Sequence, residues 1–151
     1  MTSPKASDPD FESRVRASFA RQKVMTLLGA SIRSLAPGLV EVAAPFRDDL
    51  TQQHGFLHGG ISTALLDSAC GYAALTLMPR GTGVLAIEFK VNLLAPAEGQ
   101  SFVARGRVLK PGRNITVSAA DLFCVRGGKE KICATMLATM MVVRDRPGIV
   151  D

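Results

Sequence analysis

The sequence predicts one α+β domain in which an antiparallel sheet encloses a long central helix. The 151 residues have the length of a single domain, and 47% of them are hydrophobic. The segment 59–78 is apolar on nearly every side and carries one formal charge, Asp67. A helix of this kind must be buried. Most of the chain beyond Gly81 has the alternation and the short turns of strands, so the sheet is the element available to cover the helix.

The N-terminal segment predicts a tail followed by an amphipathic helix. Residues 1–8 are polar and are expected to form a flexible tail, which leaves 9–151 as a single domain. Asp8-Pro9 has the pattern of a helix N-cap followed by proline at the first helical position. Apolar residues recur every four positions: Phe11, Val15 and Phe19. We therefore predict one helix over Pro9–Leu28.

The remaining elements are strands on either side of the buried helix. A hairpin is expected from Ala30–Leu35 and Leu39–Ala44, and a polar loop over Arg47–Phe56 precedes the helix Gly59–Met78. Pro79-Arg80-Gly81 ends that helix. Four longer strands follow, joined by short connections: Val84–Leu94, Phe102–Lys110, Asn114–Val125 and Lys131–Val143.

Composition excludes several classes of protein. The formal charge of +5 is moderate, and without a basic run or interleaved aromatic residues it does not predict nucleic-acid binding. The apolar stretch 55–79 is interrupted by polar residues and glycines, so no membrane-spanning segment is predicted. The polar N-terminus lacks the apolar run of a secretory signal. Cys70, Cys124 and Cys133 form no C-x-x-C pair, which predicts buried reduced thiols in a cytoplasmic protein and no metal site.

Two features of the central helix could carry chemistry. Gly59-Gly60 begins the helix, where backbone N–H groups and the helix dipole favour negative charge, although a tight loop-to-helix junction is an equal interpretation. Asp67 stands among apolar residues, where a carboxylate needs a partner or a function. A structural hydrogen bond or an exposed position would also explain it.

A distance argument connects these two features. Gly59 and Asp67 are eight residues apart, which is about 12 Å along a helix. One carbonyl group cannot contact both within a single helix. If they cooperate, one must come from a second subunit, with two helices antiparallel about a two-fold axis. This predicts a homodimer with two shared sites.

Other polar residues have weaker signals. His54 and His58 are the only histidines, and no serine or cysteine nucleophile motif accompanies them. His58 is interpreted as an orienting residue at the helix N-terminus rather than a catalytic base. Three cations at turns could meet phosphate groups or could be ordinary solvated residues: Lys110, Arg113 and Arg80.

The chain resembles the hotdog-fold acyl-CoA thioesterases, and among them the phenylacetate-degradation (PaaI-type) group, over roughly 39–143. One motif is Gly55-x-x-His58-Gly59-Gly60, followed by Asp67 nine residues after the histidine. Two further segments match in order: the strand Val84–Ala97 and the turn Lys110-Pro111-Gly112-Arg113.

The resemblance implies an acyl-CoA substrate hydrolysed to an acid and free CoA, without a cofactor or metal, in a homodimer that pairs into a homotetramer. It implies that the Gly59 N–H polarises the thioester carbonyl and that Asp67 of the partner subunit activates water or attacks directly. Gln52 falls where the family has Asn or Gln near the thioester, and His58 falls beside the oxyanion glycine.

The chain departs from this family at two positions. Ala86 stands where many relatives have Ser or Thr, and Gly71 stands where another branch has Thr. Neither water-positioning hydroxyl is available. A non-catalytic acyl-CoA-binding regulator or module on the same fold is therefore the alternative. A hotdog hydratase or dehydratase is a weaker one, because its His-Phe-Pro-type loop is absent.

Overall fold

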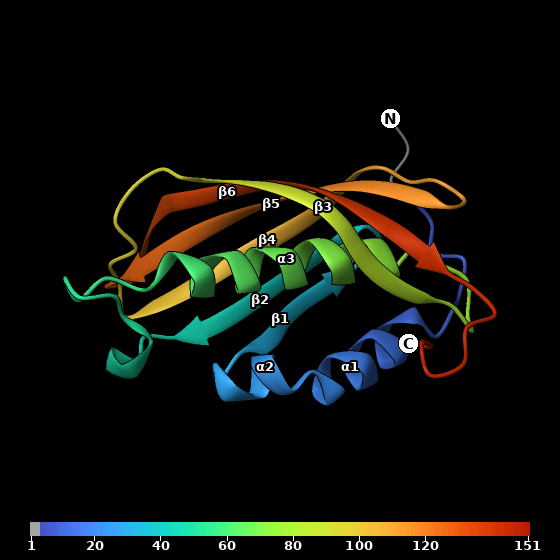
Figure 1. Cartoon of the computed structure of the whole chain (residues 1–151), viewed down its shortest axis with the longest axis horizontal. Coiled ribbons are helices and arrows are strands. Elements are labelled where there is room, and N and C mark those ends of the chain that lie inside the picture. Colours follow the sequence, from blue (N-terminus) through green and yellow to red (C-terminus); the bar gives the residue numbers. More distant parts are fainter. Residues whose placement is uncertain (1–3) are drawn as a thin grey trace.

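The computed structural model describes residues 4–151 and has one six-stranded antiparallel sheet that curves around a central helix (Figure 1). The strand order is β1-β2-β4-β5-β6-β3. The helices are α1 (Phe11–Arg21), α2 (Lys23–Leu27), the 3-10 turn η1 (Asp48–Leu50) and α3 (Gly59–Leu75). The strands are β1 (Ser31–Ala36), β2 (Leu39–Pro45), β3 (Gly83–Leu93), β4 (Ser101–Lys110), β5 (Ile115–Arg126) and β6 (Lys129–Val143). The predicted fold class is confirmed.

Helix α3 lies against the concave face of the sheet and supplies the centre of the core (Figure 1). Its buried residues are Ser62, Leu65, Leu66, Ser68, Ala69, Cys70, Tyr72, Ala73, Ala74 and Leu75. Small residues let the helix approach the sheet closely. A Cβ at Gly106 of β4 would stand 2.1 Å from the carbonyl oxygen of Ala69, so this crossing requires glycine. The packing fixes the rotation of α3 and hence the direction in which its polar residues point.

The N-terminal helix is broken, and the prediction of one helix over Pro9–Leu28 is wrong. Gln22 has an extended backbone (φ −78°, ψ 94°) that ends α1 and begins α2. Its N–H donates to Phe19 O at 3.0 Å, and its carbonyl accepts from Met25 N–H at 3.0 Å. Local hydrogen bonds therefore compensate for the break, while Met25 stays buried.

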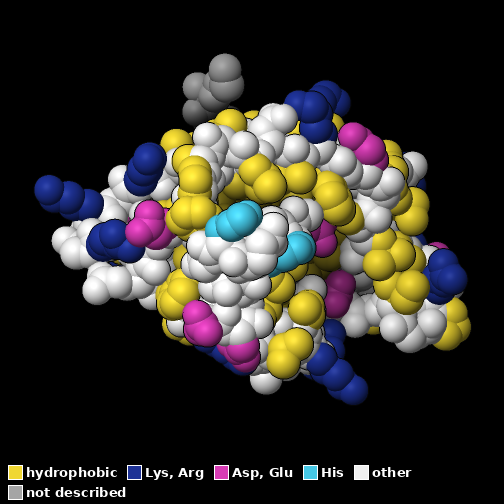
Figure 2. Space-filling model, turned by 60° about the vertical axis from the view of Figure 1, so that its left-hand side comes forward, with side chains coloured by type: hydrophobic (Ala, Val, Ile, Leu, Met, Phe, Trp, Pro, Cys, Tyr) yellow, Lys and Arg dark blue, Asp and Glu magenta, His cyan; other side chains and the backbone are white. Residues whose placement is uncertain are grey.

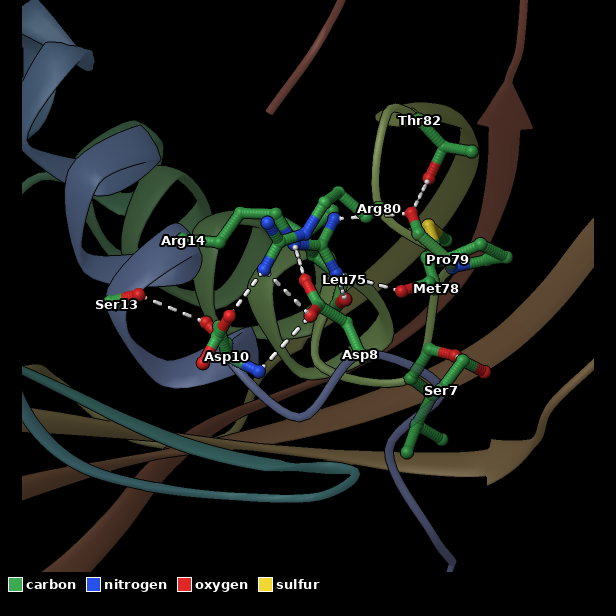
Figure 3. Close-up of polar contacts among 11 residues, drawn as sticks. Ser7, Asp8, Asp10, Ser13, Arg14, Leu75, Met78, Pro79, Arg80 and Thr82 are labelled. Carbon is green, nitrogen blue, oxygen red and sulfur yellow. Dashed lines mark hydrogen bonds and ion pairs between the residues drawn. The ribbon is translucent and has the colours of Figure 1, made fainter.

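The start of α1 is tied to the C-terminal end of α3 (Figure 3). Asp10 occupies the N-cap position expected for Asp8, while Asp8 Oδ1 accepts from Asp10 N–H at 3.0 Å. The Asp8 and Arg14 side chains, 2% and 9% exposed, form an ion pair at 3.1 Å. Of the tail expected over residues 1–8, Met1–Ser3 lie outside the described residues.

Strand β3 forms one edge of the sheet and leaves much of its surface uncovered. It pairs with β6, and within residues 4–151 no strand pairs with its other edge. Two apolar residues of the strand, Phe89 and Leu93, are 46% and 60% exposed. They are in register with buried Ala138 and Ala134 of β6, so they belong to the face that carries α3. Exposed apolar groups beside an open edge are typical of a surface that another chain covers.

The three cysteines are buried and free, as predicted: Cys70, Cys124 and Cys133. None of the helices in the described part of the chain is long and apolar enough to span a bilayer.

Candidate active site

A short, hydrogen-bonded loop precedes the N-terminus of α3. Thr51 and Leu57 form an isolated antiparallel bridge, and Gln52 N–H donates to Phe56 O at 2.9 Å. Gly55 turns the loop with a φ of +82°, a conformation that favours glycine. His58 N–H then donates to Leu50 O at 3.0 Å, which anchors the first residue before the helix.

The first turn of α3 leaves one backbone donor free. His58 is the N-cap, and its Nδ1 accepts from Gly60 N–H at 2.9 Å. The next two N–H groups, those of Ile61 and Ser62, donate to His58 O at 2.9 and 3.1 Å. The Gly59 N–H has no acceptor among the described residues. The helix dipole adds positive potential at this donor, so Gly59 is suited to bind a developing oxyanion.

His58 acts in the structure as the sequence predicts, as a hydrogen-bonding residue at the helix N-terminus. Because Nδ1 accepts a hydrogen bond, that nitrogen is unprotonated, and in the neutral ring Nε2 carries the proton. Gln52 also binds locally, since its Oε1 accepts from His54 N–H. Its amide nitrogen remains free to donate within residues 4–151.

A cleft of about 740 Å³ opens beside the free donor. Its wall combines the loop before α3 with the end of β3 and the segment that follows. The lining residues are Gln52, Gln53, Phe56, Leu57, His58, Gly59, Ser62, Leu93, Leu94, Ala95, Pro96, Ala97 and Cys133. Figure 2 shows the two histidines on one face of the molecule, with hydrophobic side chains around their loop. The cleft is mostly apolar with a few polar groups, a composition typical of ligand sites.

Asp67 lies in a second, smaller cleft of about 290 Å³. Its Oδ1 atom is buried and has no hydrogen-bond partner, and desolvation raises the pKa of the carboxyl. The lining residues are Ser18, Arg21, Gln22, Asp67, Ser68, Gly71, Tyr72, Val84, Ala86, Met140 and Asp151. A carboxylate with a raised pKa and an unpartnered oxygen is a stronger base than an exposed one.

The structure therefore brings Gln52, His58 and Gly59 together and leaves Asp67 in a different cleft. Gly59 begins α3, and Asp67 lies near its middle. Ala86 and Gly71 line the Asp67 cleft, and neither side chain offers a polar atom there.

The three candidate cations have different surroundings. Arg80 contacts Asp8 and Asp10 at 3.2 and 2.5 Å, so its guanidinium is engaged by two carboxylates. Lys110 ends β4, and Arg113 lines a cleft of about 410 Å³ near the C-terminal end of α3. Lys5 and Arg144 add positive charge to that cleft. Neither it nor Arg80 adjoins Gly59 within one chain.

Sequence reasoning missed the polar residues that surround Asp67. Ser18 and Arg21 come from α1, Gln22 comes from the break after it, and Asp151 comes from the end of the described chain. No local pattern marked them, because their helical periodicity indicates only a solvated face. Their proximity to Asp67 follows from how α1 packs beside α3.

Comparisons with known proteins agree with the fold. The model of the Thioesterase superfamily matches residues 54–131, which includes both Gly59 and Asp67. A thioesterase family protein from Silicibacter pomeroyi has 54% identity and a TM-score of 0.87, over 89% of this chain and 98% of that one. Human acyl-coenzyme A thioesterase 13 is 30% identical over 64% of this chain and 69% of its own length.

The fold comparison extends to a more distant relative. The E. coli PaaI protein from the phenylacetic acid degradation operon superposes with a TM-score of 0.79 at 20% identity, over 93% of this chain and 96% of that one. The family match covers more than half of the chain and contains the helix that carries both candidate groups. The chain belongs to the thioesterase superfamily and has its hotdog fold.

Proposed function

We propose that this chain hydrolyses acyl-CoA thioesters to a carboxylic acid and free CoA, in a site shared by two copies of the chain. One observation carries the proposal: a single helix has a free backbone donor at Gly59 and an unpartnered carboxylate oxygen at Asp67. Thioester hydrolysis requires a donor for the oxyanion and a base for the water. The printed names of relatives, acyl-coenzyme A thioesterase 13 among them, support the substrate class.

The shared site follows from the geometry of α3. Eight residues separate the two groups, which is about 12 Å of helix. If two copies of α3 pack antiparallel about a two-fold axis, Gly59 of one approaches Asp67 of the other, and two equivalent sites form. The open edge of β3 and the exposed Phe89 and Leu93 beside it support this pairing. Pairing of two such dimers into a tetramer stays a prediction.

The reaction then proceeds by charge stabilisation and proton transfer. The Gly59 N–H donates to the thioester oxygen and stabilises the oxyanion, while Gln52 Nε2 supplies a second donor from the same cleft. Asp67 of the partner subunit takes a proton from water, whose oxygen bonds to the carbonyl carbon. The C–S bond breaks as the tetrahedral intermediate collapses, and the leaving thiolate takes up the proton. His58 holds the first turn so that the Gly59 N–H faces the cleft.

The basic cleft near the end of α3 is proposed to bind the phosphates of CoA. With Gly59 opposite Asp67 in an antiparallel pair, the C-terminal end of one α3 lies beside the loop before the other α3. The cleft of Arg113 therefore comes close to the Gly59 cleft of the partner subunit. Lys110 and Arg113 are assigned to the phosphates, whereas Arg80 is held by Asp8 and Asp10.

The first test is Asp67→Asn, which preserves shape and removes the base. With a panel of acyl-CoAs and detection of released thiol, hydrolysis should fall by about 10²-fold or more. Sedimentation and circular dichroism check that the variant stays assembled and folded. Full activity of the folded variant would exclude Asp67 as the base. A wild-type chain that binds acyl-CoA without hydrolysing it would instead be the non-catalytic binding module.

The second test removes the Gly59 N–H without breaking the helix. Proline is accepted at the first helical position, and His58 before it already has the extended backbone (φ −60°, ψ 137°) that proline requires. Gly59→Pro should lower kcat by about 10²-fold or more. Gly59→Ala is the matched control: it keeps the N–H, and its Cβ meets only the movable Leu93 Cδ1, at 2.9 Å. Equal losses in both variants would exclude the donor role.

Mixing the two inactive variants tests whether the site is shared. Asp67→Asn and Gly59→Pro chains, unfolded and refolded together in equal amounts, form heterodimers with one doubly damaged site and one intact site. About a quarter of wild-type activity should return. If each chain held its own complete site, no intact site would form, and the mixture would stay inactive.

A further inference from the structure

The cleft around Asp67 has a polar wall and an apolar wall. Val84, Ala86, Met140 and Gly71 contribute no polar side-chain atom that could bind water, apart from the weakly accepting Met sulfur. A water held by the Asp67 carboxylate needs a second partner to fix its orientation. That partner must come from the opposite wall, which α1 and the residue after it provide.

Most polar groups of that wall are already engaged. Ser18 Oγ donates to Asp151 Oδ1 at 2.6 Å and lies 3.3 Å from the Tyr72 hydroxyl. Asp151 also contacts Arg21 at 3.6 Å and accepts from Val84 N–H at 3.1 Å. Arg21 also donates to Val150 O at 3.3 Å, so these side chains bond to one another or to the backbone.

Gln22 differs from these groups, because it is less exposed than Arg21, whose side chain is 59% exposed, and because one end of its amide is held while the other is unpaired. Its Oε1 accepts from Ser68 Oγ at 3.2 Å, and its Nε2 has no acceptor in the described part of the chain. Ser68 follows Asp67 directly in α3 and is 5% exposed, so this bond anchors the amide beside the carboxylate. The backbone of Gln22 is fixed as well, at the break between α1 and α2. The side chain therefore presents a free donor from a held position.

We propose that Gln22 donates from Nε2 to the water that Asp67 deprotonates, and that it is thus a further catalytic residue of the hydrolysis. A water oxygen has two lone pairs. If one accepts from Gln22 while a proton points at Asp67, the other lone pair is directed at the thioester carbonyl. No additional reactant is consumed: the proton passes to Asp67 and then to the leaving sulfur. This inference rests on the proposed function and names the group that orients its water.

The principal variant is Gln22→Ala. Loss of the donor should lower kcat by about 10-fold or more and leave KM within about twofold, because the amide contacts water rather than acyl-CoA. Lys23→Ala, at the exposed neighbouring position, is the matched control and should be unchanged. Ser68→Ala removes only the anchor of the amide and should have a smaller effect than Gln22→Ala.

A rescue experiment separates water positioning from a structural role. Ala86→Ser places a hydroxyl on the other wall of the same cleft. The double variant Gln22→Ala/Ala86→Ser should therefore recover at least about half of the decrease in log kcat that Gln22→Ala causes. A serine at position 86 cannot restore packing at the α1–α2 break, so recovery of kcat would indicate that the hydroxyl positions the water. Sedimentation and thermal melts accompany each measurement.

The outcomes distinguish this inference from the proposed function. If Asp67→Asn is inactive while Gln22→Ala keeps wild-type kcat, the role of Gln22 is overturned and the proposed function stands. A kcat loss in Gln22→Ala that Ala86→Ser does not recover also overturns it, since the effect is then structural. If wild type fails to hydrolyse any acyl-CoA, or Asp67→Asn is fully active, the proposed function itself fails.

Discussion

At the scale of single residues, the first turn of α3 assigns His58 and Gly59 separate tasks. His58 Nδ1 accepts from Gly60 N–H, so the imidazole satisfies one of the donors that a helix start leaves unpaired. Gly59 keeps its N–H free because no neighbouring group of the described chain accepts it. A capping side chain and a glycine together leave one donor exposed at a fixed position.

Substitutions at His58 distinguish a cap from a catalytic base. His58→Ala loses the hydrogen bond to Gly60 and should reduce the free energy of unfolding by about 1 kcal/mol. His58→Asn supplies another strong capping side chain and should restore that stability together with most of the activity. Urea denaturation and kcat are the measurements. Restored stability with activity still absent would show that the imidazole takes part in proton transfer.

Asp67 couples pH to both stability and activity. Desolvation raises the pKa of the folded carboxyl above its unfolded value, so the folded state binds the proton more tightly. Ionisation of Asp67 therefore lowers the free energy of unfolding, and the whole decrease is present at pH values above the pKa of the folded state. Asp67→Asn should raise Tm at neutral pH and should change it little at pH 3, where both states are protonated. Scanning calorimetry at the two pH values checks this, and a lower Tm at pH 7 would contradict it.

The same shift sets the acid limb of activity. Hydrolysis requires the carboxylate, so kcat should fall as pH decreases through the raised pKa of Asp67. The limb should lie above the usual range of aspartate. Arg21 and Asp151 are the charged groups that share its cleft.

At the scale of elements, Arg14 of α1 binds the C-terminal end of α3. Its guanidinium donates to Leu75 O at 3.2 Å and to Met78 O at 2.7 Å (Figure 3). Leu75 is the last residue of α3, and Met78 lies just beyond it. The helix therefore ends three residues before Met78, the end predicted from the sequence. Cations at a helix C-terminus satisfy its free carbonyls and the helix dipole. The position of α3, and with it Asp67, therefore depends on α1.

Removal of the Arg14 side chain should destabilise the protein strongly. Arg14→Ala leaves the Asp8 carboxylate without its buried partner and exposes the α3 carbonyls, so Tm should fall by about 5 °C or more. The matched control is Arg16→Ala, whose exposed i,i+4 pair with Glu12 should contribute less than about 2 °C. Similar shifts for the two variants in thermal melts would show that the ion pair is not stabilising.

At the scale of the whole molecule, the open edge of β3 implies a partner. Phe89 is exposed on the face of the sheet that carries α3, and an apolar ring there is stabilised when a second chain covers it. Phe89→Glu should convert the dimer to a monomer and abolish hydrolysis with it, because each monomer has only half of each site. Leu27→Glu, at an exposed apolar residue of α2, should leave both unchanged. Sedimentation velocity measures the oligomeric state, and the thiol assay measures hydrolysis. A monomer that is still active would contradict the shared site.

Much of the fold could be predicted from the sequence, because its signals are local. Apolar residues on every side of 59–78 require burial, and alternation in Val84–Leu94 requires a strand. The break at Gln22 could not be predicted, because Gln is an ordinary helix former and the bond from Ser68 Oγ to its side chain is a tertiary contact. The predicted end of α3 was three residues too far along the chain for a related reason. The carbonyls at that end bind Arg14, which is distant in sequence.

By itself, the sequence determined the fold class, the glycine at the helix start, the capping histidine and the lone carboxylate in an apolar helix. Each depends on residue type and spacing within one element. The tertiary structure alone decided that Gly59 and Asp67 open into different clefts, and that α1 lines one of them. The physical reason is that a cleft is formed by elements distant in sequence, and their approach depends on core packing that no local pattern encodes.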